Sequence, residues 1–331
     1  MLALLVAAVA VPLSVPGVGR ATRIAAHHRH LQVTGYAGDW SPPSVVDAQA
    51  HSISIVGVDG VNVSVAGTDV PRPTQGALRL LSAAHADGLK AELLVANFAV
   101  PNDAPAVATR VLTSPRHRAH IVRGLVRMVA AEGWDGVTVD IEELAPTDGV
   151  GLAHFVELLR SELPRRDLLA VDVSAAPSLG AYARLGYRLT ALSKVADVVL
   201  MAYDQHGPWS GPGPIGGLPW QRACLDAALH EVPAARLVLG VPAYGYTWPA
   251  GAREDGVTLS VVQARHQAAA AHVRPRWDAP QGEWTVRLRD GTVIWWADSR
   301  SYRHRLRLAT IDHLAGVAVW QLASSDHLPP L

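Results

Sequence analysis

Cysteine is almost absent from this sequence. The chain of 331 residues contains one, Cys224, which allows neither a disulfide framework nor a metal site built from several thiolates. Neither sign of charge is in excess, because 29 Lys and Arg face 29 Asp and Glu, so nothing favours nucleic acid or an anionic membrane as a partner. The sequence also lacks a Walker loop, a zinc-binding pair of histidines and a Gly-x-Ser-x-Gly elbow. What is abundant is hydrophobic residues, 49% of the chain, which predict a globular protein.

The first residues form an apolar run broken by prolines. Residues 1–21 have about the length of a signal peptide, whereas a membrane span needs about 20 uninterrupted apolar residues. No basic residue precedes the run, so a wrongly assigned start and an uncleaved anchor remain alternatives. We expect a signal peptide over 1–21, a linker over 22–30 and a secreted or envelope-associated protein. The linker histidines His27, His28 and His30 have no acidic or cysteine neighbours, which favours a solvated segment over a metal site.

The remaining residues, 31–331, alternate between predicted strands and amphipathic helices. This alternation is typical of a parallel sheet, and eight strands fit a (β/α)8 barrel better than an open sheet. The predicted strands are 31–37, 53–59, 89–97, 135–142, 168–174, 195–204, 236–245 and 316–323. The predicted helices are 75–86, 117–133, 151–163, 218–232 and 298–314.

Two segments do not fit the alternation. Residues 61–65 could form a hairpin arm on the second strand. Residues 249–297 predict a small α+β insertion between strand seven and the last helix, with a hairpin that turns at Asp290-Gly291.

A glycine-rich stretch, Gly211, Gly213 and Gly216, follows the sixth strand and matches the dinucleotide-binding pattern G-x-G-x-x-G. A phosphate site of that kind needs free backbone N–H groups and a helix close behind. Pro212 and Pro214 remove two of those donors. We therefore expect a rigid loop at the barrel mouth and no nucleotide cofactor.

The fourth predicted strand carries two carboxyl groups on one face. Side chains alternate along a strand, so Thr138, Asp140 and Glu142 point into the barrel, toward the mouth where barrel active sites lie. Two neighbouring carboxyl groups raise one pKa and keep one of them protonated as an acid. A buried ion pair with arginine is the alternative, but the strand carries no basic residue.

These residues resemble the signature D-G-x-D-x-D-x-E of glycoside hydrolase family 18, the chitinase-like family. Asp135, Gly136, Asp140 and Glu142 match it, and Thr138 stands where the first aspartate of the central pair would be. Segments 85–98, 201–220 and 237–248 are similar to the spore-germination, cortex-lytic N-acetylglucosaminidase type within that family.

The resemblance implies further site residues. The segment MAYD, Met201 to Asp204, matches the motif in which a tyrosine and an aspartate hold the substrate's acetamido group, here Tyr203 and Asp204. Trp320 matches the tryptophan beneath the sugar at the cleavage point, although a tryptophan on a terminal strand is equally often a core residue. Met201, Asp204, Trp320, Thr138 and Asp135 are predicted as substrate-binding residues.

The family's chemistry is retaining and substrate-assisted, an exception among retaining glycosidases. It implies Glu142 as acid and then base, Asp140 as the partner of the acetamido N–H, and Tyr203 as a further catalytic residue. The implied substrate is a β-linked, N-acetylglucosamine-containing glycan, either chitin oligosaccharide or peptidoglycan. No cofactor, metal or protein partner is implied. A non-catalytic, chitinase-like glycan-binding protein is the alternative function.

Overall fold

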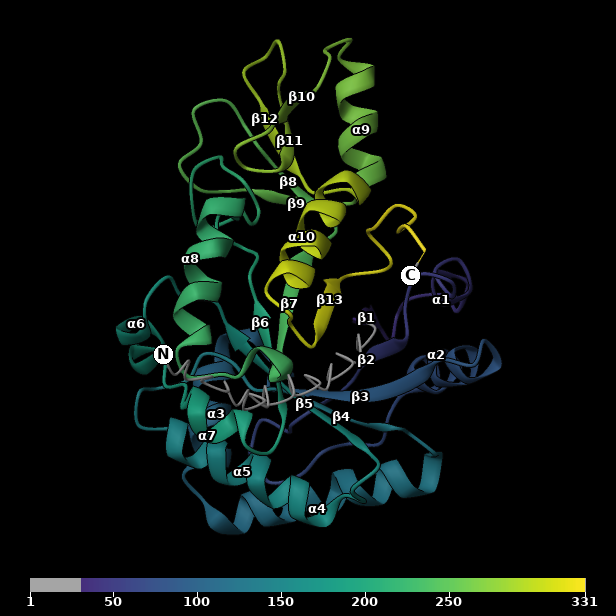
Figure 1. Cartoon of the computed structure of the whole chain (residues 1–331), viewed down its shortest axis with the longest axis vertical. Coiled ribbons are helices and arrows are strands. Elements are labelled where there is room, and N and C mark those ends of the chain that lie inside the picture. Colours follow the sequence, from purple (N-terminus) through teal and green to yellow (C-terminus); the bar gives the residue numbers. More distant parts are fainter. Residues whose placement is uncertain (1–30, 331) are drawn as a thin grey trace, which may run out of the picture. The chain divides into compact units, whose positions relative to one another are not determined.

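Eight parallel strands form a closed barrel in the computed structural model, which describes residues 31–330 (Figure 1). Their order around the barrel is β1-β13-β7-β6-β5-β4-β3-β2, so the last strand closes against the first. The strands are β1 (Gln32–Gly38), β2 (Ile55–Asn62), β3 (Lys90–Ala96), β4 (Gly136–Asp140), β5 (Leu168–Ser174), β6 (Asp197–Met201), β7 (Leu237–Pro242) and β13 (Gly316–Trp320). The predicted (β/α)8 barrel is confirmed. The predicted signal peptide, the linker and its histidines lie outside the described residues.

The helices connect the strands in sequence order. They are α1 (Ser44–Asp47), α2 (Gln75–Ala86), α3 (Ala104–Leu112), α4 (Pro115–Glu132), α5 (Gly149–Glu162), α6 (Leu179–Arg184), α7 (Leu189–Ser193), α8 (Leu218–Leu229) and α10 (Ser299–Ile311). Local sequence sets their ends. Ser114 caps α4 by accepting from the N–H of His117, Pro115 suits the first turn, and Gly133 ends the helix at φ +86°.

The hairpin arm predicted at 61–65 is wrong. The second strand continues through Val61 and Asn62, which pair in parallel with β3, after a register shift between Asp59 and Val61. The shift is a local irregularity of one strand, and the alternating valines 61, 63 and 65 imitate a separate arm in the sequence.

The predicted insertion is an antiparallel sheet with one helix. The sheet order is β10-β11-β12-β8-β9. In Figure 1 this sheet and α9 lie together near one end of α10. The hairpin around Asp290-Gly291 is confirmed by the pairing of β11 with β12. The insertion begins at Gly245, four residues before the prediction, because Gly245–Trp248 forms a strand of this sheet. The elements are β8 (Gly245–Trp248), β9 (Val257–Leu259), α9 (Val261–Ala270), β10 (Arg276–Asp278), β11 (Glu283–Arg287) and β12 (Val293–Trp296).

The barrel has two apolar layers. The outer layer lies between strands and helices and includes Val137, Val139 and Ile141, as strand alternation predicts. The inner layer is smaller and fills the barrel interior with Tyr36, Leu94, Ala96, Ala170, Val199, Val238 and Ala318. This inner layer forms a floor below the carboxyl ends of the strands. No helix within residues 31–330 combines the length and apolar character that a membrane span requires.

Candidate active site

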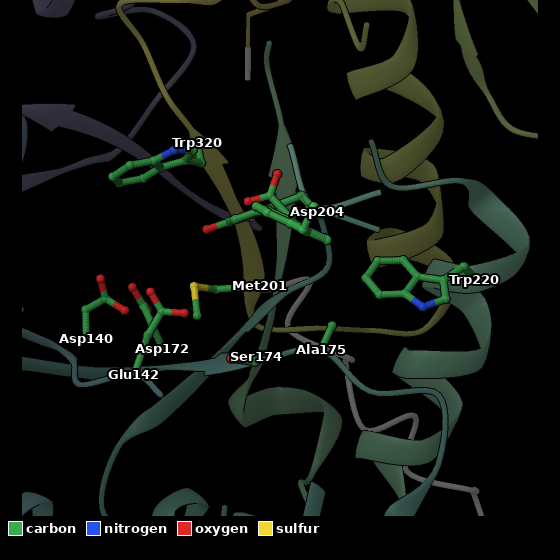
Figure 2. A pocket seen from close by; sticks show the side chains of 11 residues that line it. Asp140, Glu142, Asp172, Ser174, Ala175, Met201, Asp204, Trp220 and Trp320 are labelled. Atoms are coloured by element: carbon green, nitrogen blue, oxygen red, sulfur yellow. The ribbon is translucent and has the colours of Figure 1, made fainter. Parts of the chain in front are cut away.

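A cavity of about 390 Å³ opens where several strands reach their carboxyl ends. Strands β4, β5, β6 and β13 all contribute to it, together with the loop after β6 and the start of α8 (Figure 2). Its lining residues are Asp140, Glu142, Asp172, Ser174, Ala175, Met201, Tyr203, Asp204, Trp209, Trp220 and Trp320. The location agrees with the place of active sites in barrel enzymes.

Six of the eight predicted site residues line this one cavity, namely Asp140, Glu142, Met201, Tyr203, Asp204 and Trp320. The other two lie elsewhere. Thr138 is buried two residues before Asp140 on the same face of β4, and its hydroxyl donates to Glu92 Oε2 at 3.0 Å. Asp135 precedes β4 at the opposite end of the strand, where it contacts His85 Nε2 at 2.9 Å and accepts from the N–H of Ala91.

The electrostatics of the two predicted catalytic carboxyl groups suit acid chemistry. Burial raises the pKa of Glu142 to about 7, and the carboxylates of Asp204 and Glu143 add to the shift. Burial also raises the pKa of Asp140 well above its usual range, followed by Glu142 and Asp172 as neighbouring charges. A Glu142 side chain that stays protonated near neutral pH can donate its proton to a leaving group.

The backbone of Glu142 is held by Asn97, which lies just after β3 and is fully buried. Its amide oxygen accepts from the Glu142 N–H at 2.9 Å, and its amide nitrogen donates to the Glu142 carbonyl at 3.0 Å. The same nitrogen donates to the carbonyl of Ala104. These bonds fix the backbone of Glu142, which lies beyond the end of β4 and is therefore not held by the barrel sheet. The sequence prediction missed Asn97, because an asparagine at a strand end is also an ordinary turn residue.

Asp204 is bound by two tyrosines that the sequence prediction also missed. Tyr244 and Tyr246 both donate their hydroxyl protons to Asp204 Oδ1, Tyr246 at 2.9 Å. Burial raises the pKa of Asp204, and these hydrogen bonds oppose the shift. The two tyrosines are two residues apart, so they share a face of the chain that leaves β7. That spacing was the available signal.

Aromatic side chains surround the cavity. Trp320 packs against Tyr36 with ring centroids 5.7 Å apart and 56° between the planes. Trp209 lies on the loop after β6 and is 58% exposed, and Trp220 belongs to α8. Rings on several sides of a polar cavity suit a ligand with both hydroxyl groups and apolar faces, as sugars have.

Two backbone N–H groups of the glycine-rich loop are bound by a buried side chain. The buried carboxylate of Glu283 accepts from the N–H groups of Ile215 at 2.7 Å and Gly216 at 2.9 Å. Glu283 is in turn paired with Arg305 at 3.0 Å, and both side chains are fully buried. These donors are therefore used within the fold. No group of three or more His, Cys, Asp or Glu side chains that could hold a metal occurs within residues 31–330.

Comparison with known proteins decides the family. The family described as "Glycosyl hydrolases family 18" matches residues 108–326. The chain belongs to this family. The family match spans β4 through β13, and therefore all of the cavity-lining residues.

Individual relatives of this family 18 chain are distant. The cortical fragment-lytic enzyme of Bacillus subtilis is 28% identical over 225 residues, covering 63% of this chain and 51% of that protein. A solved chitinase from Chromobacterium violaceum is 28% identical, with a TM-score of 0.81, covering 90% of this chain and 96% of that one. The spore cortex-lytic enzyme SleL of Bacillus cereus has the same fold, with a TM-score of 0.79 at 18% identity, over 89% and 71% of the two chains. The chain spans about half the length of the cortical fragment-lytic enzyme of Bacillus subtilis. The resemblance to the cortex-lytic type is confirmed.

Proposed function

We propose that this chain hydrolyses β-linked N-acetylglucosamine-containing glycans with retention, by substrate-assisted catalysis. The observation that carries the proposal is the meeting of Asp140, Glu142, Tyr203, Asp204 and Trp320 in one cavity at the carboxyl ends of the barrel strands. The family match supports glycosidic chemistry, and the cavity supplies the groups that such chemistry requires.

Glu142 is the proposed acid and base. Its raised pKa, about 7, leaves it protonated when the substrate binds, so it can protonate the oxygen of the leaving sugar. The acetamido carbonyl oxygen of the substrate attacks the anomeric carbon as the glycosidic bond breaks, which gives an oxazolinium ring. Glu142, now ionised, then takes a proton from the water that opens this ring.

The other cavity residues hold the acetamido group. Asp140, ionised, accepts from the acetamido N–H and stabilises the positive charge of the oxazolinium. The hydroxyl of Tyr203 donates to the acetamido oxygen, and Asp204 supports the same side of the cavity while Tyr244 and Tyr246 hold it. Trp320 supplies an apolar surface for the sugar ring. A substrate without a 2-acetamido group cannot complete this mechanism.

The proposed substrate is peptidoglycan or soluble N-acetylglucosamine glycan in preference to crystalline chitin. The cavity is compact, about 390 Å³, and the loop with Trp209 borders it. The cortical fragment-lytic relative points to cell-wall glycan. A tobacco class V chitinase of this fold was solved in complex with NAG4, which supports an N-acetylglucosamine oligomer as ligand. Peptidoglycan lies outside the cytoplasmic membrane, so the proposal includes export through residues 1–21.

The test compares purified peptidoglycan, soluble chitooligosaccharides and crystalline chitin at equal enzyme concentration. We expect release of reducing ends from the first two, with products of retained anomeric configuration, and inhibition by a thiazoline mimic of the oxazolinium. Binding without release of reducing ends from any substrate would instead support a glycan-binding protein. A trapped covalent enzyme–sugar adduct would contradict substrate assistance, and fastest release from crystalline chitin would contradict the substrate preference.

A further inference from the structure

Four carboxyl groups line the cavity, and the mechanism proposed above gives no role to one of them, Asp172. Its position follows from strand register. Val171 of β5 pairs with Val139 of β4, so the next residues, Asp172 and Asp140, lie at the same level and point into the barrel. Adjacent strands lie about 4.8 Å apart. Figure 2 shows the carboxyl groups of Asp140, Glu142 and Asp172 directed toward the same space.

The carboxyl group of Asp140 lacks a hydrogen-bond partner on its own strand. Its Oδ1 atom is buried and has no partner within residues 31–330. Thr138, on the same face of β4, directs its hydroxyl to Glu92 and so does not serve Asp140. Buried polar atoms in native proteins are almost always hydrogen-bonded, and two carboxyl groups side by side satisfy this rule when they share one proton.

Asp172 is suited to be that partner. It is 3% exposed, and its Oδ1 accepts from the hydroxyl of Tyr36 at 3.1 Å, which fixes the orientation of the group. Burial raises the pKa of Asp172 well above its usual range, and the charges of Glu142 and Glu92 raise it further, against the opposing effect of the Tyr36 hydrogen bond. A carboxyl group in these surroundings retains a proton more readily than one in water.

We propose that Asp172 is the positioning residue of Asp140, and that the two carboxyl groups share one proton across the β4–β5 strand pair. When Asp140 is ionised, the proton resides on Asp172, whose O–H donates to Asp140 and holds it toward the substrate. The partner comes from the neighbouring strand because Thr138 occupies the nearest inward position on β4 itself. This inference rests on the proposed function for its meaning in catalysis, although the shared proton is a property of the free protein.

The pH dependence distinguishes a shared proton from simple repulsion. Asp172 faces Tyr36 on β1, Glu92 on β3, Glu142 after β4 and Tyr203 after β6, besides Asp140 itself. As a protonated donor, Asp172 stabilises ionised Asp140 and lowers its pKa. As a negative charge, it would raise that pKa. Removal of the side chain therefore moves the acid limb of the pH–rate profile upward in the first case and downward in the second.

The experiment measures kcat against pH for wild type, Asp172→Ala and Asp172→Asn on a soluble chitooligosaccharide. We expect Asp172→Ala to raise the acid limb by about one pH unit and to lower kcat about tenfold or more, with a small change in KM. Asp172→Asn carries a neutral N–H donor of the same size, so it should restore the acid limb and part of kcat. The control Asp59→Asn removes a carboxyl group that acts on Asp140 only through its charge. The acid limb of the pH–rate profile of this control should stay where it is or move to lower pH.

A downward or unchanged limb in Asp172→Ala would overturn the inference. A second measurement does not need activity. The carboxyl ¹³C resonances of the wild-type chain, labelled at aspartate, are followed as a function of pH. The variants Asp172→Ala and Asp140→Asn assign the two resonances. A shared proton makes both resonances move in two coupled steps. Independent single-step titrations would contradict the proposal even if the chain proved inactive on every glycan, and coupled steps in an inactive chain would leave the pair standing while the proposed function fails.

Discussion

At the scale of single residues, the site depends on groups that touch the reacting sugar and on groups that hold them in place. Asp140→Asn keeps the size of the side chain but removes its negative charge. We expect kcat to fall 100-fold or more, because the oxazolinium loses the charge that stabilises it. The measurements are kcat and the inhibition constant of a thiazoline. The inhibition constant should rise as kcat falls, because the thiazoline binds more weakly. Unchanged thiazoline affinity would show that Asp140 does not act on this intermediate.

Asn97 offers a test of positioning alone. Asn97→Ala removes both hydrogen bonds to the Glu142 backbone and should lower kcat about tenfold while costing about 1–3 kcal/mol of stability. The matched control is Asn62→Ala, which removes the amide that accepts from the N–H of Phe98 at 2.7 Å on the neighbouring strand. Chemical denaturation measures the loss of stability in both variants, and kinetics should show a loss of kcat in Asn97→Ala only. Equal kinetic losses in both would mean that Asn97 has no special connection to Glu142.

At the scale of elements, the loop after β6 is tied to α10 and to the insertion by the buried pair of Arg305 and Glu283. Arg305 also donates to the carbonyl of Gly216 and to Gln221 of α8, so one side chain connects α10 with α8, the insertion and the loop after β6. Arg305→Met leaves Glu283 charged, buried and unpaired, and should lower the free energy of unfolding by about 3–5 kcal/mol. Denaturant titration at pH 7 measures this loss.

The control for that prediction lies between α8 and α10 as well. Arg222 pairs with Asp312, and its side chain is 34% exposed, so solvent weakens the interaction. Arg222→Met should cost only about 0–1 kcal/mol in the same titration. A loss in Arg305→Met no larger than in this control would show that the buried pair does not secure the loop.

At the scale of the whole molecule, the barrel and the insertion could be predicted because each strand follows a strong alternating or continuous hydrophobic pattern. The short helix α3 was missed, since Pro101 and Pro105 mark the segment as a loop although Pro105 is compatible with a helix start. The two carboxyl groups of β4 were predictable from alternation along one strand. The places of Asp172 and Asn97 beside Asp140 and Glu142 were not predictable in this way, because they depend on the register between neighbouring strands.

Buried carboxyl groups also affect the stability of the whole fold. Glu92 is buried inside the barrel, and burial raises its pKa to about 7 from its ordinary value of 4.5. The folded state then binds more protons than the unfolded state between these two values, so Glu92 destabilises the fold progressively as pH rises through that range. Glu92→Gln should therefore raise Tm relative to wild type at pH 8 more than at pH 4.5. An equal difference at both pH values would contradict the raised pKa.

The most direct test of the central claim is Glu142→Gln. Glutamine keeps the shape of the side chain and the Asn97 contacts to the backbone, but it cannot donate a proton to the leaving sugar. We expect hydrolysis of soluble chitooligosaccharides to fall by about 10²–10⁴-fold or more, with glycan affinity nearly unchanged and no loss of Tm. A Glu142→Gln chain that kept more than about a tenth of wild-type kcat would show that Glu142 is not the catalytic acid.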